Sequence, residues 1–98
     1  SNVEAATTLR LARDFGNIVA VKEASGNLEQ VMTIIKNKPK DFKVISGDDA
    51  LTLPMISCGV DGVISVLGNA FPKDFSDMVR YALNNEMDEA RANHYKLF

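Results

Sequence analysis

The chain has 98 residues, which fits one domain at most and excludes a multidomain protein. Its net charge of -2 favours neither nucleic acid nor an anionic membrane as a partner, and no apolar stretch is long enough to span a bilayer. Cys58 is the single cysteine, so an internal disulfide is excluded and a reducing, cytoplasmic location is expected.

The first half of the chain predicts two helices around a buried strand. Ser1 and Glu4 have the spacing of a capping box, so the first helix is expected to begin there and to end before Gly16. Residues 18–21 then read as a strand. Asn27 is a good N-cap for the second helix, which we expect to end before Pro39.

The second half repeats this alternation. Strands are predicted at 43–46 and 62–66, with a helix between them that starts after Asp48 or Asp49 and ends at Gly59. Pro72 opens a fourth helix. A fifth runs from Met87 to the end of the chain. Its expected apolar positions are Ala90, Tyr95, Leu97 and Phe98.

The three predicted strands are rich in Val and Ile and lack strict alternation, which is typical of parallel strands covered on both faces. Each gap between strands leaves room for a helical crossover, so the fold class is α/β, either an open sheet or part of a barrel. Neither outer strand carries the Lys or Pro that guards a sheet edge. We therefore expect a segment of a larger parallel barrel that is poorly soluble or self-associates when isolated.

The candidate catalytic residue is Lys22, which stands at the carboxyl end of the first strand, the edge where α/β proteins bind ligands. A Lys partly withdrawn from water there can attack a carbonyl and form a Schiff base. The competing interpretation is a strand-ending Lys whose charge simply reaches water. Glycine-containing turns follow all three strands, so this rim is able to bind a small keto acid.

Other polar residues have structural interpretations. Asn27 and Asp48 are predicted helix caps. Asp48 and Asp49 are not expected to bind a metal, because no His or third carboxylate lies nearby at a useful spacing. Strand alternation places Glu23 on the opposite face from Lys22. His94 is expected to be a surface or packing residue.

Three blocks carry a family resemblance: residues 19–27 (VAVKEASGN), residues 45–49 (ISGDD) and residues 62–66 (GVISV) with Asn69 beyond. In this order and spacing they resemble the dihydrodipicolinate synthase (4-hydroxy-tetrahydrodipicolinate synthase) family of pyruvate-dependent class I aldolases and lyases. The resemblance covers essentially the whole chain. It implies that residues 1–98 are a partial (β/α)8 TIM barrel, the C-terminal portion with strands six to eight, flanking helices and one extra helix.

The same resemblance implies the chemistry. Lys22 would form a Schiff base with pyruvate, and the enamine would attack aspartate semialdehyde in lysine (diaminopimelate) biosynthesis. The family's pyruvate contacts fall on Gly47 and on Ile64, the latter through its backbone carbonyl. No metal or organic cofactor is implied. Full-length members are commonly homotetramers, so a homo-oligomer is expected.

The chain also departs from the family pattern. The family's proton-relay Tyr, its two Thr partners and its Arg for the second substrate belong to strands not present in this sequence. Tyr81 and Tyr95 fall on predicted helices and cannot replace that Tyr. We therefore expect this chain alone to be nearly inactive. Two alternatives stay open: a sibling lyase acting on N-acetylneuraminate or a keto-deoxy sugar acid, and a non-catalytic half-barrel that mediates association.

Overall fold

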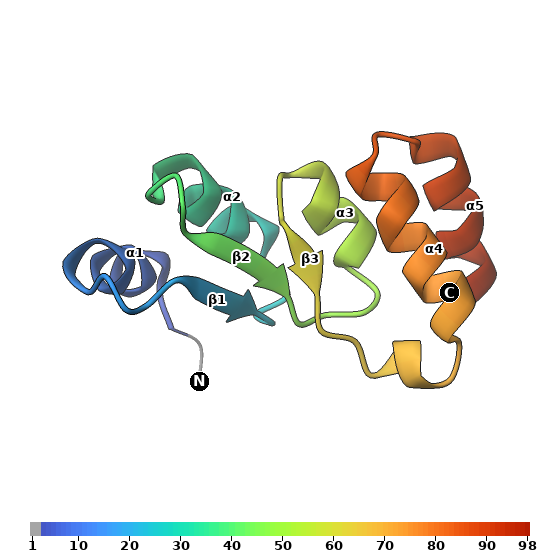
Figure 1. The fold of residues 1–98 in the computed structure, drawn as a ribbon, viewed down its shortest axis with the longest axis horizontal. Coiled ribbons are helices and arrows are strands. Elements are labelled where there is room, and N and C mark those ends of the chain that lie inside the picture. Colours follow the sequence, from blue (N-terminus) through green and yellow to red (C-terminus); the bar gives the residue numbers. More distant parts are fainter. Residues whose placement is uncertain (1–2) are drawn as a thin grey trace.

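Helices and strands alternate along the computed structural model, which describes residues 3–98 (Figure 1). In chain order the elements are α1 (Ala5–Asp14), β1 (Ala20–Glu23), α2 (Leu28–Asn37), β2 (Lys43–Ser46), α3 (Thr52–Ser57), β3 (Gly62–Val63), the short 3-10 helix η1 (Leu67–Asn69), α4 (Pro72–Leu83) and α5 (Met87–Leu97). The alternating order predicted from the sequence is confirmed.

The strands form one sheet in the order β1-β2-β3, and both pairs are parallel, as predicted. Lys22 lies opposite Ile45, and Ile45 lies opposite Gly62. The predicted bounds were wrong for two strands. β1 is displaced two residues towards the carboxyl end and includes Glu23, and β3 ends at Val63 rather than at residue 66. After β3, Ile64 makes one more ladder bond, to Ser46, before the chain turns into η1.

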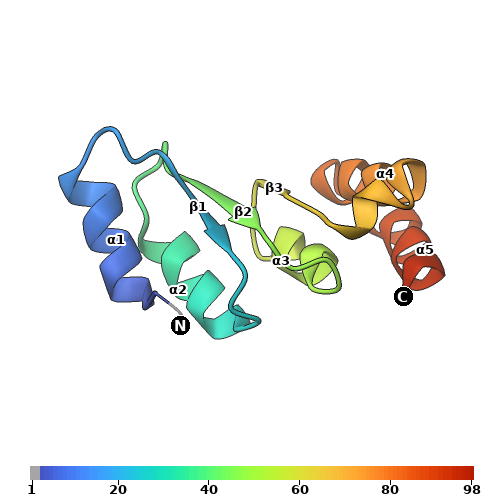
Figure 2. The same ribbon diagram turned by 90° about the horizontal axis from the view of Figure 1, so that it is seen from below.

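Helices cover only one face of the sheet, and Figure 2 shows α2 and α3 on the same side of the strands. Val21, Val44 and Val63 face these helices and pack into the two apolar clusters of the core. The alternate residues face away, and Lys22 and Ile64 are exposed there. We call this uncovered side the open face. The expectation that both faces are covered was wrong for this chain, because every crossover returns on the same side.

The core has two parts. One lies between α2 and the sheet and is built from five buried residues, namely Val31, Ile34, Val44, Met55 and Val60. The other joins α3 to α4 and α5 and contains Leu53, Ile56, Phe75, Met78, Ala82 and Ala90. Together they fix the sheet to its helices, so the strand ends that carry the candidate site rest on a packed layer.

The predicted helix starts are confirmed for α2, α4 and α5, which begins at Met87, and were wrong for α1 and for α3, which begins at Thr52. Asn27 caps α2 with its side-chain oxygen 3.1 Å from the Gln30 amide nitrogen, and Pro72 is the first residue of α4. α1 begins only at Ala5, with Glu4 at its N-cap and no side-chain cap bond, so the predicted start was wrong. Ser1 itself lies outside the described residues.

Two of the four apolar positions predicted for α5 are confirmed, because Ala90 is buried and Leu97 packs against the same core cluster. The predictions for Tyr95 and Phe98 were wrong. Ala90 and His94, four residues apart, face inward together, whereas Tyr95 is 74% exposed and Phe98 is 50% exposed. One residue along a helix rotates the side chain by about 100°, so a buried His94 directs Tyr95 to solvent. Within residues 3–98, no helix combines the length and the apolar composition needed to cross a membrane.

Candidate functional site

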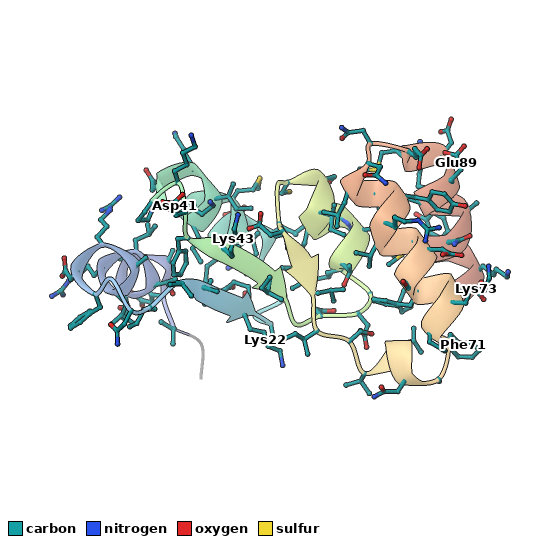
Figure 3. All side chains as sticks on the ribbon, viewed as in Figure 1. Lys22, Asp41, Lys43, Phe71, Lys73 and Glu89 are labelled. Atoms are coloured by element: carbon teal, nitrogen blue, oxygen red, sulfur yellow. The ribbon has the colours of Figure 1, made fainter. Side chains whose placement is uncertain are left out.

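Lys22 occupies the open face near the carboxyl end of β1. In Figure 3 its side chain extends away from α2 and α3. This orientation follows from strand alternation, since the next residue, Glu23, is buried on the helix side. The predicted opposition of the two side chains is confirmed. An amine in this position can reach a molecule lying on the open face without passing through the helical layer.

The side chain of Lys22 crosses directly over Gly47, the first residue after β2. A Cβ atom at position 47 would lie 2.6 Å from Cε and 3.1 Å from Cγ of Lys22. It would also lie 3.0 Å from Cβ of Ala24. Only a residue without a side chain leaves this space free, so Gly47 allows the Lys22 chain to lie flat across the neighbouring strand.

Gly47 and Ile64 continue the same hydrogen-bonded ladder. The Gly47 amide donates to the Glu23 carbonyl at 2.7 Å, and the Ile64 amide donates to the Ser46 carbonyl at 2.8 Å. Ile64 is 58% exposed, and no backbone N–H of residues 3–98 donates to its carbonyl oxygen. The structure thus brings Lys22, Gly47 and Ile64 to one end of the sheet, as the parallel arrangement required.

Lys22 is exposed in this chain, so the expectation of an amine partly withdrawn from water was wrong here. The reason is the open face, which no other element of residues 3–98 covers. Among the described residues no carboxylate forms a salt bridge with Lys22. A cavity of about 220 Å³ at the edge of β1 is lined by Lys22 together with Val3, Val21, Glu23, Ala24, Ser25 and Gln30.

Behind the amine lies a hydrogen-bonded group that the sequence did not predict. Glu23 as a residue is only 5% exposed, and its carboxylate accepts from the Ser25 hydroxyl at 3.1 Å and from the Gln30 side-chain amide at 3.2 and 3.3 Å. Gln30 lies three residues after Asn27, which is the position of a capping-box residue. Its side chain instead reaches from the first turn of α2 to the strand, a tertiary contact for which the sequence holds no local signal.

The turn after β2 is held by its own polar residues. Asp48 accepts from the Leu51 amide at 3.4 Å within this turn. α3 begins only at Thr52, with Leu51 at its N-cap and no side-chain cap bond, so the predicted helix cap at Asp48 was wrong. One oxygen of Asp49 accepts from the Leu67 amide at 3.0 Å, so this carboxylate joins the turns that follow β2 and β3. Its other oxygen is buried without a hydrogen-bond partner among residues 3–98. In the same part of the chain no three His, Cys, Asp or Glu side chains cluster closely enough for a metal ion.

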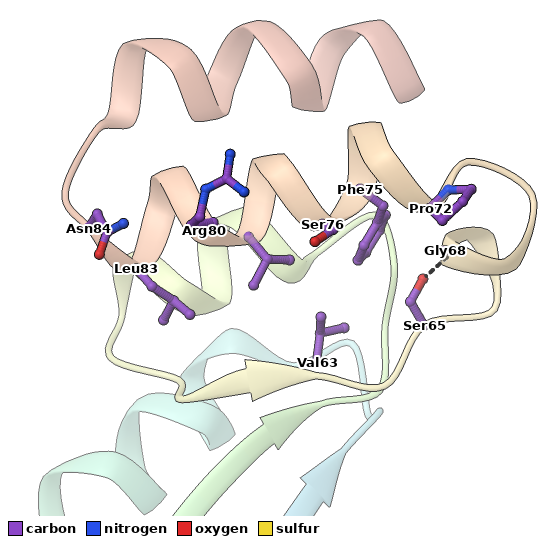
Figure 4. A pocket seen from close by; sticks show the side chains of 10 residues that line it. Val63, Ser65, Gly68, Pro72, Phe75, Ser76, Arg80, Leu83 and Asn84 are labelled. Carbon is purple, nitrogen blue, oxygen red and sulfur yellow. Dashed lines mark hydrogen bonds between the residues drawn. The ribbon is translucent and has the colours of Figure 1, made fainter.

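A larger cavity, of about 510 Å³, lies away from Lys22, between β3 and α4 (Figure 4). Its walls are mainly apolar and include Val63, Phe75, Val79 and Leu83. This cavity follows the side of β3 that pairs with no strand in the described part of the chain. It lies apart from Lys22, Gly47 and Ile64, the site residues predicted from the sequence.

The comparisons with known proteins all point to one family. Residues 1–98 match the model of the dihydrodipicolinate synthetase family. The chain is 60% identical over 94 residues to the 4-hydroxy-tetrahydrodipicolinate synthase of Parabacteroides distasonis, covering 96% of this chain and 32% of that protein. It is 60% identical over 95 residues to the synthase of Phocaeicola vulgatus, again covering 32% of the relative.

Solved structures agree with the sequence relatives. The crystal structure of dihydrodipicolinate synthase from Aquifex aeolicus superposes with a TM-score of 0.94 at 41% identity, over 98% of this chain and 33% of that one. The chain therefore spans about a third of the length of the relatives that it matches.

Proposed function

The chain belongs to the dihydrodipicolinate synthetase family, and from this membership we propose that it supplies the Schiff-base lysine of a 4-hydroxy-tetrahydrodipicolinate synthase. In this proposal residues 1–98 form the part of a (β/α)8 barrel that contains strands six to eight. The open face then lies towards the barrel interior, where a substrate would be enclosed. The supporting observation is the position of Lys22, which lies flat over Gly47 at the carboxyl end of a parallel sheet.

The reaction begins when the uncharged Nζ of Lys22 attacks the ketone carbon of pyruvate. Loss of water leaves an imine, and loss of a proton from the methyl carbon gives an enamine. The enamine carbon then attacks the aldehyde carbon of aspartate semialdehyde. The amino group that the semialdehyde brought attacks the imine carbon, which closes the ring, breaks the bond to Nζ and returns the free lysine. The amine itself carries the covalent intermediate, so the proposed chemistry assigns no step to a metal or organic cofactor.

Gly47 and Ile64 are proposed to hold pyruvate beside the amine. Gly47 leaves the backbone accessible next to Lys22, and the Ile64 carbonyl oxygen is free of backbone donors within residues 3–98. Positioning of this kind supplies a large part of the rate of a two-substrate reaction. The proton-relay Tyr, its two Thr partners and the Arg for the second substrate are not supplied by this segment, so we propose that the isolated chain is nearly inactive.

Borohydride trapping tests the proposed role of Lys22. The matching segment of the Parabacteroides distasonis synthase is replaced by this chain, and the chimaera is incubated with pyruvate and borohydride. Mass spectrometry is expected to find the reduced adduct on Lys22. Lys22→Arg should abolish the adduct because a guanidinium does not form the imine, whereas Lys43→Arg, a matched exposed lysine on β2, should keep it.

An intact chimaera without an adduct on Lys22 would contradict the proposal and favour a non-catalytic association module. Assays of the same chimaera with aspartate semialdehyde, N-acetylmannosamine and sugar-derived aldehydes then separate the synthase from the sibling lyases. Measurable synthase turnover by the isolated chain would contradict the proposed inactivity of residues 1–98 alone.

A further inference from the structure

Glu23 is a buried carboxylate directly behind the site amine. The residue is 5% exposed, and none of the cations in residues 3–98 forms a salt bridge with it. Burial of a carboxylate is unfavourable unless hydrogen bonds replace its water, and an apolar side chain would fill the same space at lower cost. The choice of an acid here therefore indicates a requirement for hydrogen-bond acceptors at this point.

The carboxylate collects donors from both sides of the turn between β1 and α2. Ser25 donates from the turn, and Gln30 donates from α2. The side-chain amide of Gln30 also donates to the Val3 carbonyl at 3.0 Å, which connects the segment before α1 to the Glu23 carboxylate. The Ser25 hydroxyl in addition accepts from the Asn27 amide at 3.2 Å. Glu23 is thus the acceptor for both Ser25 and Gln30, and Ser25 links the Asn27 amide to it.

The main chain of Glu23 connects this network to the site. Its carbonyl accepts from the Gly47 amide at 2.7 Å, so the residue is bound to α2 through its side chain and to β2 through its backbone. Because Lys22 and Glu23 are adjacent on a strand, any rotation of the strand end that moves one moves the other in the opposite direction. Fixing the Glu23 carboxylate therefore fixes the direction in which Lys22 leaves the strand.

We propose that Glu23 is a positioning residue that holds Lys22 over Gly47 for imine formation with a 2-oxo acid. It does not touch the substrate and acts only through the strand end. This inference rests on the proposed function, because it assigns Glu23 a part in the reaction of Lys22. A glutamine at position 23 would turn an amide N–H2 towards Ser25 and Gln30, and it would lose acceptors that the carboxylate provides.

The test uses the Glu23→Gln variant and the reciprocal exchange Glu23→Gln with Gln30→Glu, which restores one amide and one carboxylate to the pair. The maximal rate of adduct formation with pyruvate is measured by borohydride trapping in the chimaera. Hydrogen exchange of the Gly47 amide is measured in the 98-residue chain itself. Glu29→Gln, an exposed acid in the first turn of α2, is the matched control.

Glu23→Gln is expected to lower the maximal adduct rate about 10- to 100-fold, since a misplacement of about 1 Å can cost about 10²-fold. The pyruvate concentration for half-maximal rate should change little, and exchange of the Gly47 amide should become faster. The double variant Glu23→Gln with Gln30→Glu should restore both the adduct rate and the slow hydrogen exchange of the Gly47 amide. Glu29→Gln should alter neither. An unchanged adduct rate in Glu23→Gln overturns the inference. It is also overturned if the double variant Glu23→Gln with Gln30→Glu recovers the slow hydrogen exchange of the Gly47 amide but not the adduct rate.

Failure of the proposed function gives a different result. In that case the unsubstituted chimaera forms no adduct on Lys22, which rejects the catalytic part of the inference as well. Gly47 exchange in the chain then still shows whether Glu23 fixes the strand end. If the Gly47 amide exchanges its hydrogen equally fast in Glu23→Gln and in the unsubstituted chain, Glu23 does not fix the strand end. This result rejects the geometric part of the inference whatever the chemistry.

Discussion

At the scale of single residues, the candidate site depends on which side chains are missing as much as on which are present. Lys22 lies over Gly47, and on the same face the end of Ile45 comes within 3.8 Å of the Cβ position of Gly62. A Cβ at position 62 would make only an ordinary contact with Ile45, whereas a Cβ at position 47 would lie 2.6 Å from Cε of Lys22, so Gly47 is the glycine that leaves necessary room. The direction of Lys22 is therefore set by its neighbour on β2 as well as by its own backbone.

Gly47→Ala tests this space directly. The new methyl group would meet Lys22 and Ala24, so we expect the Lys22 chain to be displaced and the rate of pyruvate adduct formation to fall about 10-fold or more. Unfolding in urea should show a loss of about 1 kcal/mol, at the lower end for overpacking, because the lysine end is flexible. Gly16→Ala is the control, since a Cβ there meets nothing within 4 Å. Equal adduct rates in both variants would show that Gly47 does not direct Lys22.

His94 makes the stability of the chain depend on pH. Burial lowers the pKa of its imidazole below the usual 6.5, because desolvation disfavours the charged form. The unfolded chain then binds a proton more readily than the folded one. Stability from the neutral ring is complete above about pH 6.5 and is lost as the pH falls through the lowered folded pKa.

We expect urea unfolding of the chain to give a lower free energy at pH 5 than at pH 7.5. His94→Gln should remove part of this difference, because glutamine does not titrate. A pH dependence identical in the two proteins would contradict a neutral, buried His94.

At the scale of elements, the turns after the strands are tied to one another and to the helices. Asp49 joins the turn after β2 to η1 after β3, and Glu23 joins β1 to α2. These bonds hold the three strand ends in a fixed relation although β3 itself is only two residues long. The rim is thus organised by these side-chain bonds together with the backbone bonds from Gly47 to Glu23 and from Ile64 to Ser46.

The cap of α2 gives a measurable contribution at this scale. Asn27→Ala removes the side-chain oxygen that accepts from the backbone amide of Gln30, and we expect a loss of about 1 kcal/mol in the free energy of unfolding. Asn17→Ala, in an exposed turn before β1, should cost much less. Thermal or urea unfolding of both variants provides the measurement. Equal losses would mean that the Asn27 cap adds nothing beyond a general effect of the substitution.

At the scale of the whole molecule, the structure is a one-sided sheet. α2 and α3 cover one face, whereas the open face and the free sides of β1 and β3 expose backbone groups and apolar side chains. Val66 is 82% exposed, Val19 is 64% exposed and Ile64 is 58% exposed. Unpaired strand edges next to apolar surface are templates for further strand pairing.

We therefore expect the isolated chain to self-associate. Sedimentation velocity over a range of concentrations should show species larger than a monomer, and the proportion should rise with concentration. Val66→Lys, which adds a charge to the exposed surface, should reduce this association. A clean, stable monomer at all concentrations would contradict the expectation.

The sequence by itself determined the alternating order of elements, the parallel sheet, the Asn27 cap and the position of Lys22 at a strand end. Each of these depends on local patterns of apolar residues, capping residues and alternation, which neighbours in the chain specify. It also determined that Glu23 and Lys22 point to opposite faces, because that follows from strand geometry alone.

Only the tertiary structure decided that one face of the sheet is open, that Lys22 is exposed and lies over Gly47, and that Glu23 is held by Ser25 and Gln30. It also decided that His94 rather than Tyr95 is buried. These features depend on which side each crossover takes and on how α5 rotates against its neighbours. Both are set by packing between segments far apart in the chain, for which a local pattern holds no information.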